Sequence, residues 1–324
     1  MDVDGVRLRT SVRGVGSEKT AGPPLLIITG LGASLQLAEP FERELTTHGL
    51  QTITFDAPGV GESTNYRWPR RMPGIVRTIG HMLDALGYTQ VDVLGVSLGG
   101  VIAQQFAHQA PQRVRRLILA ATGPGVVGLG GVPGSPRALL TLVTRRRYTS
   151  PDYYRRIAGN LYGGAARNDP DALLHGSIAR FSKPTSITGY LGQLYAISFW
   201  TAIPWLRGLT QPTLVLAGDD DPIIPVINGR ILARCIPDAR LHIVPGGGHL
   251  FLLERPAEIA GLVAGFLRTE DRPPNDAETV PKSPQRTRLS RNASRRSMSE
   301  HDRSQRNGSE RRVAPGDASQ DGEK

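Results

Sequence analysis

The 324-residue sequence has little of several features that would fix its class at once: it has one cysteine, no long apolar run and no leader-like start. With Cys235 as the only cysteine, an internal disulfide is excluded. No run approaches the roughly 18 apolar residues that a transmembrane helix needs. The first residues, Met1 to Gly5, lack the basic and apolar regions of a secretory signal peptide. These absences predict a cytoplasmic protein without a transmembrane segment.

The sequence also lacks a nucleic-acid-binding motif, although it carries 39 Lys and Arg against 29 Asp and Glu. Residues 269–324 hold 12 of the basic and 10 of the acidic residues, so a net charge of +8 remains on residues 1–268. That charge is spread over short runs such as Arg145-Arg146-Arg147. We interpret it as a solvated basic surface and expect no nucleic-acid partner; attraction to an anionic surface is the alternative.

Aromatic residues are absent after Arg268, and large aliphatic residues are scarce there. Residues 269–324 therefore cannot bury enough apolar surface to offset the entropy of ordering the chain, and we predict a disordered tail. The centre of this tail is basic, which leaves two interpretations open. It is either a plain solvated tail or a tether to an acidic partner or surface.

Short apolar runs alternate with segments of helical periodicity through the first 268 residues. The runs are Leu25–Ile28, Thr52–Phe55, Val91–Leu94, Leu117–Leu119, Leu214–Leu216 and Leu241–Val244. The helical segments are Ile75–Leu86, Leu98–His108, Val226–Cys235 and Ala257–Leu267. Such alternation predicts an α/β fold with a mostly parallel sheet and helices on both of its faces. At the N-terminus, Val3 to Val12 alternates polar and apolar residues as an edge hairpin would.

One long stretch interrupts this alternation. Residues 123–134 contain six glycines and two prolines, which indicates a connection that leaves the sheet. Residues 135–205 then have helical and irregular patterns and hold ten of the 18 aromatic residues. We predict core segments at 1–132 and 206–268 with a helical cap at 133–205. The aromatics build either the core of this cap or an apolar binding wall on its inner face.

The strongest chemical signal is Gly95-Val96-Ser97-Leu98-Gly99, a G-x-S-x-G element between a predicted strand and a predicted helix. A serine at such a tight turn projects its hydroxyl above the sheet, and it lies near the positive end of the following helix. The alternative is a glycine-rich turn with a solvent-facing serine. In this strand–turn–helix context the element resembles the nucleophile elbow of the α/β-hydrolase fold family, which implies that Ser97 is a nucleophile.

A serine nucleophile needs a base and a group that orients the base. His249 follows three glycines on a loop after the last predicted strand, where loops converge over an active site, and it is the predicted base. His81 and His108 lie on predicted helices and are expected to be packed or solvated. Asp221 is the predicted acid, because the family resemblance implies the spacing G-x-x-D-x-x-x-P; its neighbour Asp220 is the rival.

An oxyanion hole needs two backbone N–H groups that point at the developing negative charge. Leu98, which follows the nucleophile, is the first predicted donor. The second is Leu31, because Thr29-Gly30-Leu31-Gly32 resembles the family's H-G-x-G loop. This sequence has Thr29 where many members have histidine. The segment Asp56–Ser63 matches a turn of the family, D-x-P-G-x-G-x-S, and we interpret it as scaffold.

Within the family the chain resembles the intracellular medium-chain poly(3-hydroxyalkanoate) depolymerases over roughly residues 25–268. The segments that carry this resemblance are Phe55–Gly61, Gly95–Ser97, Ala103–His108, Arg147-Tyr148, Tyr162–Gly164, Gln193-Leu194, Trp200-Thr201, Gln211–Pro222 and Gly248–Leu252. Two features differ from those enzymes. Leu98 stands where they usually have tryptophan, and they lack the long tail.

The residues and the resemblance together predict a carboxylic ester hydrolase that acts through an acyl-enzyme on medium-chain 3-hydroxyacyl esters or polyesters. No metal or organic cofactor is implied. Within serine chemistry, the alternatives are a general lipase or carboxylesterase and a carbon–carbon bond hydrolase. Ser97 disfavours haloalkane dehalogenases and most epoxide hydrolases, which use an aspartate nucleophile. An alternative from another class is a non-catalytic protein that coats lipid or polymer inclusions. The sequence leaves the oligomeric state open.

Overall fold

The computed structural model describes residues 1–14, 22–126, 128–143, 145–171 and 185–269. Apart from Thr269, the predicted tail lies outside the described residues. Part of the predicted cap, including Phe181, also lies outside them.

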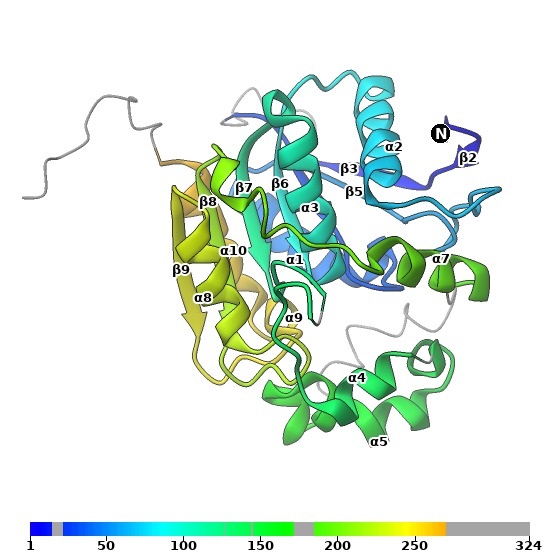
Figure 1. The fold of residues 1–324 in the computed structure, drawn as a ribbon, viewed down its shortest axis with the longest axis vertical. Helices are drawn as coiled ribbons and strands as arrows, with labels where there is room; N and C mark the ends of the chain where they lie inside the picture. Colours follow the sequence, from blue (N-terminus) through cyan, green and yellow to red (C-terminus); the bar gives the residue numbers. More distant parts are fainter. Residues whose placement is uncertain (15–21, 127, 144, 172–184, 270–324) are drawn as a thin grey trace, which may run out of the picture. The chain divides into compact units, whose positions relative to one another are not determined.

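A seven-stranded sheet organises the chain (Figure 1). In their spatial order its strands are β3 (Thr10–Arg13), β5 (Thr52–Phe55), β4 (Leu25–Ile28), β6 (Val91–Val96), β7 (Val114–Ala120), β8 (Thr213–Gly218) and β9 (Ala239–Val244). Only the edge strand β3 pairs antiparallel, with β5, and the other neighbours are parallel. The predicted mostly parallel sheet is confirmed, and each predicted inner strand lies within one of these strands.

The N-terminal segment differs from the single edge hairpin that its alternation predicts. Strands β1 (Asp2–Val3) and β2 (Val6–Arg7) form a separate two-stranded hairpin, and only β3 joins the main sheet. The turn between β1 and β2 contains Asp4 and Gly5, both with positive φ, which is how a chain reverses within two residues.

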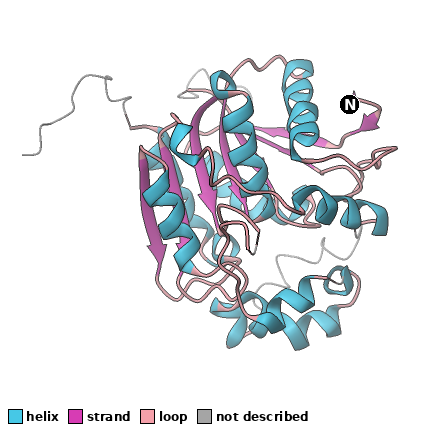
Figure 2. Cartoon of the chain, viewed as in Figure 1, coloured by secondary structure: helices cyan, strands magenta, loops and turns pink. Residues whose placement is uncertain are grey.

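Alternate residues of the inner strands face two separate layers of helices (Figure 2). On one face, Leu26 and Ile28 of β4 pack in a core shared with α2 (Met72–Ala85), α3 (Leu98–Gln109) and α8 (Val226–Cys235). On the other face, Leu25 and Ile27 pack in a core shared with α1 (Leu35–Thr47), α9 (Phe251–Glu254) and α10 (Pro256–Leu267). A strand that is buried on both faces reads as a continuous apolar run, which is why the sequence located these strands well.

Helix α1 is absent from the helices that the sequence predicts. It contains Pro40, and a proline inside a helical pattern ordinarily interrupts the helix. The helix is anchored from within the fold instead. Glu42 is fully buried and accepts hydrogen bonds from Thr52 and Thr54 of β5, while Arg13 of β3 forms an ion pair with it.

The predicted cap, residues 133–205 (hereafter the insert), joins β7 to β8. Its elements are α4 (Pro136–Leu142), the 3-10 helix η2 (Arg145–Tyr148), α5 (Pro151–Tyr162), the 3-10 helix η3 (Gly164–Arg167) and α7 (Ile187–Ile197). Helices α4 and α5 lie side by side (Figure 1) and share a small apolar core around Tyr154, which Ile223 also joins. After α7, the chain returns to the main core, where Trp200 packs. The described part of the insert contains no strand, and an isolated bridge joins Thr201 near its end to Gly125, which precedes the insert.

Among the described residues, no helix has the length and apolar character that crossing a bilayer requires.

Candidate active site

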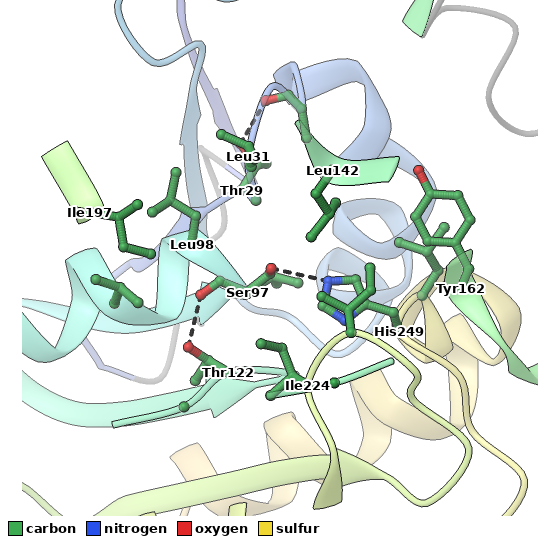
Figure 3. Close-up of a pocket in the computed structure, with 18 of the residues that line it drawn as sticks. Thr29, Leu31, Ser97, Leu98, Thr122, Leu142, Tyr162, Ile197, Ile224 and His249 are labelled. Atoms are coloured by element: carbon green, nitrogen blue, oxygen red, sulfur yellow. Dashed lines mark hydrogen bonds between the residues drawn. The ribbon is translucent and has the colours of Figure 1, made fainter. Parts of the chain in front are cut away.

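Ser97 lies at a strained turn between β6 and α3. Its φ is +55°, a value that only a small fraction of non-glycine residues adopt. The backbone is held there on both sides, because the Ser97 N–H donates to the carbonyl of Ala120 at 2.9 Å and the Ser97 carbonyl accepts from Thr122 Oγ1 at 2.8 Å. Figure 3 shows Ser97 between Thr122 and His249. This is the tight strand-to-helix turn that the G-x-S-x-G spacing predicts.

The glycine two residues after Ser97 is required by a close approach of backbone. A Cβ on Gly99 would lie 2.0 Å from the carbonyl oxygen of Ile28, the last residue of β4. The start of α3 can therefore abut the end of β4 only if residue 99 has no side chain. The loop after β4 also lies close to the serine, since a Cβ on Gly30 would lie 3.4 Å from Ser97 Cβ.

His249 and Asp221 form a hydrogen-bonded chain with Ser97. His249 Nε2 lies 3.0 Å from Ser97 Oγ, and His249 Nδ1 lies 2.7 Å from Asp221 Oδ2. The other carboxylate oxygen of Asp221 accepts the N–H groups of Ile223 and Ile224, at 2.8 and 2.9 Å. The Asp221 side chain is fully buried and that of His249 is almost so. Such an arrangement can take a proton from the serine hydroxyl and stabilise the imidazolium that results.

Asp220, the rival for the acid, faces away from His249. Its carboxylate forms a bidentate pair with Arg167 of η3, at 2.6 and 2.8 Å, and accepts the N–H of Gly164 at 2.7 Å. These partners, Arg167 first, hold the pKa of Asp220 below its ordinary value. Of the two adjacent acids, only Asp221 contacts the imidazole.

The two predicted oxyanion donors come from different segments of the chain. Leu98 directly follows Ser97, and Leu31 lies in the loop after β4. Leu98 is the first residue of α3, so its N–H belongs to the helix N-terminus, which has no earlier carbonyl partner within the helix. Leu31 lies in a turn that the Ala33 N–H closes by donating to the carbonyl of Gly30 at 3.1 Å. Thr29, which replaces the histidine of many relatives, braces this turn by donating to the carbonyl of Ala33 at 2.8 Å.

A cavity of about 360 Å³ opens above Ser97 and His249. Its wall is overwhelmingly apolar and comes both from the sheet side and from the insert. Aliphatic residues of the insert and of the loop after β8 predominate on that side: Leu139, Leu142, Leu194, Ile197, Ile223 and Ile224. Figure 3 shows Leu142, Ile197 and Ile224 around the site. Its size lies within the usual range of small-molecule sites, about 300–1,000 Å³.

Of the two interpretations of the insert's aromatics, a core and a binding wall, the described residues fit the core better. Among the described aromatics of the insert, only Tyr148 and Tyr162 line the cavity. The others pack elsewhere or face solvent: Tyr154 is fully buried beside α4 and Trp200 lies in the main core, whereas Phe199 is 81% exposed. Composition counts aromatics in a segment but does not say which face of a helix they occupy.

Sequence reasoning missed several polar residues around the site. Thr122 holds the Ser97 carbonyl, and Arg147, Tyr148 and Gln193 of the insert contact the loop that contains Leu31. No local motif marks them, although the resemblance to depolymerases includes Arg147-Tyr148 and Gln193-Leu194. His108 takes no part in the site. Its ring stacks on Trp205, with ring centroids 4.3 Å apart.

Within the part of the chain that the structure describes, no group of three or more His, Cys, Asp or Glu side chains is placed to hold a metal ion.

Comparisons with known proteins show the family of the chain. A family model for the alpha/beta hydrolase fold matches residues 23–256. The chain is 47% identical over 271 residues to a poly(3-hydroxyalkanoate) depolymerase of Ectopseudomonas oleovorans, covering 83% of this chain and 92% of that protein. It is 31% identical to a 2-hydroxy-6-oxo-6-phenylhexa-2,4-dienoate hydrolase of Comamonas testosteroni, covering 68% and 78%.

The solved structures that resemble the chain share its fold. The enol-lactonase of Burkholderia xenovorans LB400 superposes with a TM-score of 0.69 at 22% identity and covers 82% of this chain and 98% of its own.

Proposed function

The chain belongs to the α/β-hydrolase fold family, and from this premise we propose that it is a serine hydrolase of carboxylic esters. Its substrates are medium-chain 3-hydroxyacyl esters, including those of poly(3-hydroxyalkanoates). The observation that carries the proposal is the chain Ser97–His249–Asp221, with links of 3.0 and 2.7 Å, at the floor of an apolar cavity. The 47% identity to a poly(3-hydroxyalkanoate) depolymerase supports the choice of substrate class.

In the proposed reaction, Ser97 Oγ attacks the ester carbonyl while His249 Nε2 takes the hydroxyl proton. The carbonyl carbon becomes tetrahedral, and its oxygen carries a negative charge. Collapse of this intermediate breaks the bond to the leaving alkoxy oxygen, which receives the proton from His249. Water, deprotonated by His249, then attacks the acyl-enzyme and releases the free acid and Ser97.

Asp221 and two backbone donors complete the proposed machinery. Asp221 holds His249 Nδ1–H, so that Nε2 of the neutral ring faces Ser97, and its charge stabilises the imidazolium. The N–H groups of Leu98 and Leu31 stabilise the negative oxygen. Each such donor contributes on the order of 10²- to 10³-fold to kcat in enzymes of this type.

The cavity supports an apolar acyl chain of medium length. Its lining offers few polar atoms apart from the groups around Ser97. Each methylene that enters such a site contributes about 0.8 kcal/mol, close to fourfold in affinity. Extending the acyl chain from four to eight carbons is therefore expected to raise kcat/KM on the order of a hundredfold.

The exposed side chains in and near the insert support a solid polymer as the substrate. Nine of the eleven large apolar side chains that are exposed in the described residues lie between residues 129 and 203. Exposed apolar side chains are the groups through which a protein surface contacts another apolar body. We infer that this part of the protein adsorbs to the polymer while single chains enter the cavity.

A series of p-nitrophenyl esters from two to twelve carbons, run beside a suspension of medium-chain poly(3-hydroxyalkanoate), tests the proposal. We expect an optimum at about six to ten carbons and release of soluble 3-hydroxy acids from the polymer. Ser97→Ala is expected to lower both activities by several orders of magnitude with an unchanged circular dichroism spectrum.

Three outcomes would contradict parts of this proposal. A flat profile or an acetyl optimum would reject the apolar acyl cavity. A medium-chain optimum without polymer degradation would leave a general lipase or carboxylesterase. Failure of a fluorophosphonate probe to label Ser97, together with no turnover, would favour the non-catalytic binding protein.

A second candidate is a carbon–carbon bond hydrolase, because the chain is 31% identical to a 2-hydroxy-6-oxo-6-phenylhexa-2,4-dienoate hydrolase. The same Ser97 and His249 would serve a different carbonyl. Loss of the dienoate chromophore on addition of the enzyme, faster than hydrolysis of p-nitrophenyl octanoate, would select this candidate over the ester hydrolase.

A further inference from the structure

Side chains of the insert hold opposite ends of one peptide group in the loop after β4. The carbonyl of Leu31 accepts the Tyr148 hydroxyl at 2.6 Å and, more weakly, the Arg147 guanidinium at 3.5 Å, and the Gly32 N–H donates to Gln193 Oε1 at 2.8 Å. In a trans peptide the C=O and the N–H point in opposite directions. The peptide between Leu31 and Gly32 is therefore held from both sides, by η2 and by α7.

These contacts lie inside the protein. Tyr148 is 6% exposed and Gln193 is 8% exposed. A third buried contact follows on the same loop, where Thr185 Oγ1 donates to the carbonyl of Gly32 at 2.6 Å. Hydrogen bonds away from water are electrostatically stronger than exposed ones, and leaving their partners unsatisfied costs more. The insert therefore fixes this loop far more firmly than a solvent-covered turn would be fixed.

The peptide between Leu31 and Gly32 is the central peptide of a β-turn, and its orientation decides the type of that turn. Residues 30–33 form a turn closed by Ala33 N–H and Gly30 O, with a φ of +70° at Gly32. A positive φ at the third residue is the mark of a type II turn, and rotation of the central peptide converts it into type I. Tyr148 and Gln193 hold that central peptide, so they select one of the two turn conformations.

Side-chain packing supports the same conformation. A Cβ on Gly32 would lie 2.9 Å from Cε2 of Tyr148 and 3.1 Å from the ring of Tyr190. The loop and the insert are thus in direct contact at this residue. Gly30, at the start of the turn, lies against Ser97, with 3.4 Å between its Cβ position and Ser97 Cβ. The first residue of the turn therefore lies directly beside the nucleophile.

We propose that Tyr148 and Gln193 are positioning residues: by holding the peptide that follows Leu31, they fix the position of Leu31 beside Ser97, so that its own N–H, which belongs to the preceding Gly30–Leu31 peptide, points at the oxyanion. The proposal rests on the proposed function, because it assigns the second oxyanion donor to Leu31. Neither side chain takes part in bond making. The insert therefore supplies part of the geometry for catalysis as well as part of the acyl cavity.

The test compares Tyr148→Phe and Gln193→Met with Tyr153→Phe as the matched control. Tyr148→Phe keeps the ring that lines the cavity and removes only the hydroxyl that binds Leu31. Tyr153 lies in the same insert on α5, outside the cavity lining. For each protein we measure kcat and KM on p-nitrophenyl octanoate, and inhibition by 1-octanol. We also measure binding of octylboronic acid, amide hydrogen exchange of residues 30–33, and the melting temperature.

Octylboronic acid bonds to Ser97 Oγ and places a negative oxygen in the oxyanion hole, whereas 1-octanol fills only the acyl cavity. We expect both variants to lose roughly tenfold in kcat and a similar factor in boronate affinity, a part of the 10²- to 10³-fold that one donor contributes. KM, inhibition by 1-octanol and the melting temperature should stay near wild type. Exchange of residues 30–33 should quicken, and Tyr153→Phe should match wild type throughout.

Unchanged kcat and boronate affinity in both variants, with an active wild type, would overturn the positioning role alone. Equal losses in boronate and 1-octanol affinity would overturn it too, because they would show a damaged cavity. If the wild-type protein neither turns over the ester nor binds the boronate, the proposed function fails instead.

Discussion

At the scale of single residues, three consecutive aspartates illustrate how position decides a role. Asp219 accepts the N–H of Gly246 at 2.6 Å, Asp220 pairs with Arg167, and Asp221 contacts His249. All three follow the same strand, β8, at its carboxyl end. Only the last is fully buried with both of its oxygens occupied by the imidazole and by backbone N–H groups.

We expect Asp221→Asn to lower kcat on the order of 10⁴-fold, because an amide favours the wrong imidazole tautomer and cannot stabilise the imidazolium. Asp219→Asn and Asp220→Asn should each cost less than about tenfold, since their carboxylates face other partners. Turnover of p-nitrophenyl octanoate measures all three. A large loss of kcat in Asp220→Asn, together with an active Asp221→Asn variant, would contradict the assignment of Asp221 as the acid.

The local motifs single out Ser97, His249 and Asp221 as candidates because each follows a strand at a recognisable spacing. The partners that hold the site could not be found in this way. Tyr148 and Gln193 lie 117 and 161 positions from the loop groups they bind, and no local pattern encodes such contacts. Burial and distance in the folded chain, rather than residue type, identify them.

At the scale of elements, the short helix η3 ties the insert to the loops that carry His249 and Asp221. The carbonyl of Tyr162, just before η3, accepts the His249 N–H at 2.6 Å. Gly164 and Arg167, the two ends of η3, both bind Asp220. The Arg167–Asp220 pair is partly solvated, with side chains 46% and 37% exposed, so we expect it to contribute at most about 1 kcal/mol.

This pair predicts a pH dependence of stability. Arg167 lowers the pKa of Asp220 below its ordinary 3.8, so the stabilisation is present above pH 3.8 and is lost as the pH falls through the lower, folded-state value. At pH 7, Arg167→Met should therefore lower the melting temperature by about 2–4 °C, and the difference should shrink below pH 3.8. Calorimetry from pH 3 to pH 7 measures it, with exposed Arg207→Met as the control.

A difference that persists unchanged at pH 3 would show that Arg167 stabilises the fold through packing rather than through the Asp220 carboxylate.

Elements with one dominant pattern were predictable and those with competing signals were not. The predicted bounds of α8, β4 and β5 coincide with the observed ones, because each has a single clear pattern: helical for α8, continuously apolar for β4 and rich in β-branched residues for β5. Helix α1 was missed, since Pro40 lies inside it. The sequence left two roles open for the aromatics of the insert, because burial of an aromatic there serves the small core of α4 and α5 as readily as the cavity.

At the scale of the whole molecule, the sequence could predict a parallel sheet but not the order of its strands. The order β3-β5-β4-β6-β7-β8-β9 depends on which strands pair, and periodicity carries no information on pairing. The predicted tail lies outside the described residues, and the cytoplasmic location stays a prediction. The gathering of exposed apolar residues between 129 and 203 is visible only once burial is known.

That distribution predicts a separation of polymer degradation from small-ester turnover. Leu140 and Phe199 are 74% and 81% exposed and do not line the cavity. We expect the double variant Leu140→Gln/Phe199→Asn to degrade the polymer roughly tenfold more slowly, a loss of about 1.4 kcal/mol in adsorption. Hydrolysis of p-nitrophenyl octanoate should be unchanged. Asparagine suits position 199 because its φ is +63°.

Trp68, 73% exposed and outside the insert, supplies the control Trp68→Gln, which should degrade the polymer at the wild-type rate. Equal losses in this control and in the double variant would refute a specific adsorbing surface.

The hydrogen bonds from Tyr148 and Gln193 to the loop after β4 also bear on how such enzymes diversify. A segment that lines the acyl cavity and supports the loop beside the nucleophile cannot be exchanged as an independent module. A chimera that receives a foreign insert acquires a new specificity and loses turnover in the same step, unless the graft also brings a hydroxyl and an amide to these two places. Directed evolution of this scaffold should therefore vary the aliphatic wall and keep those two side chains.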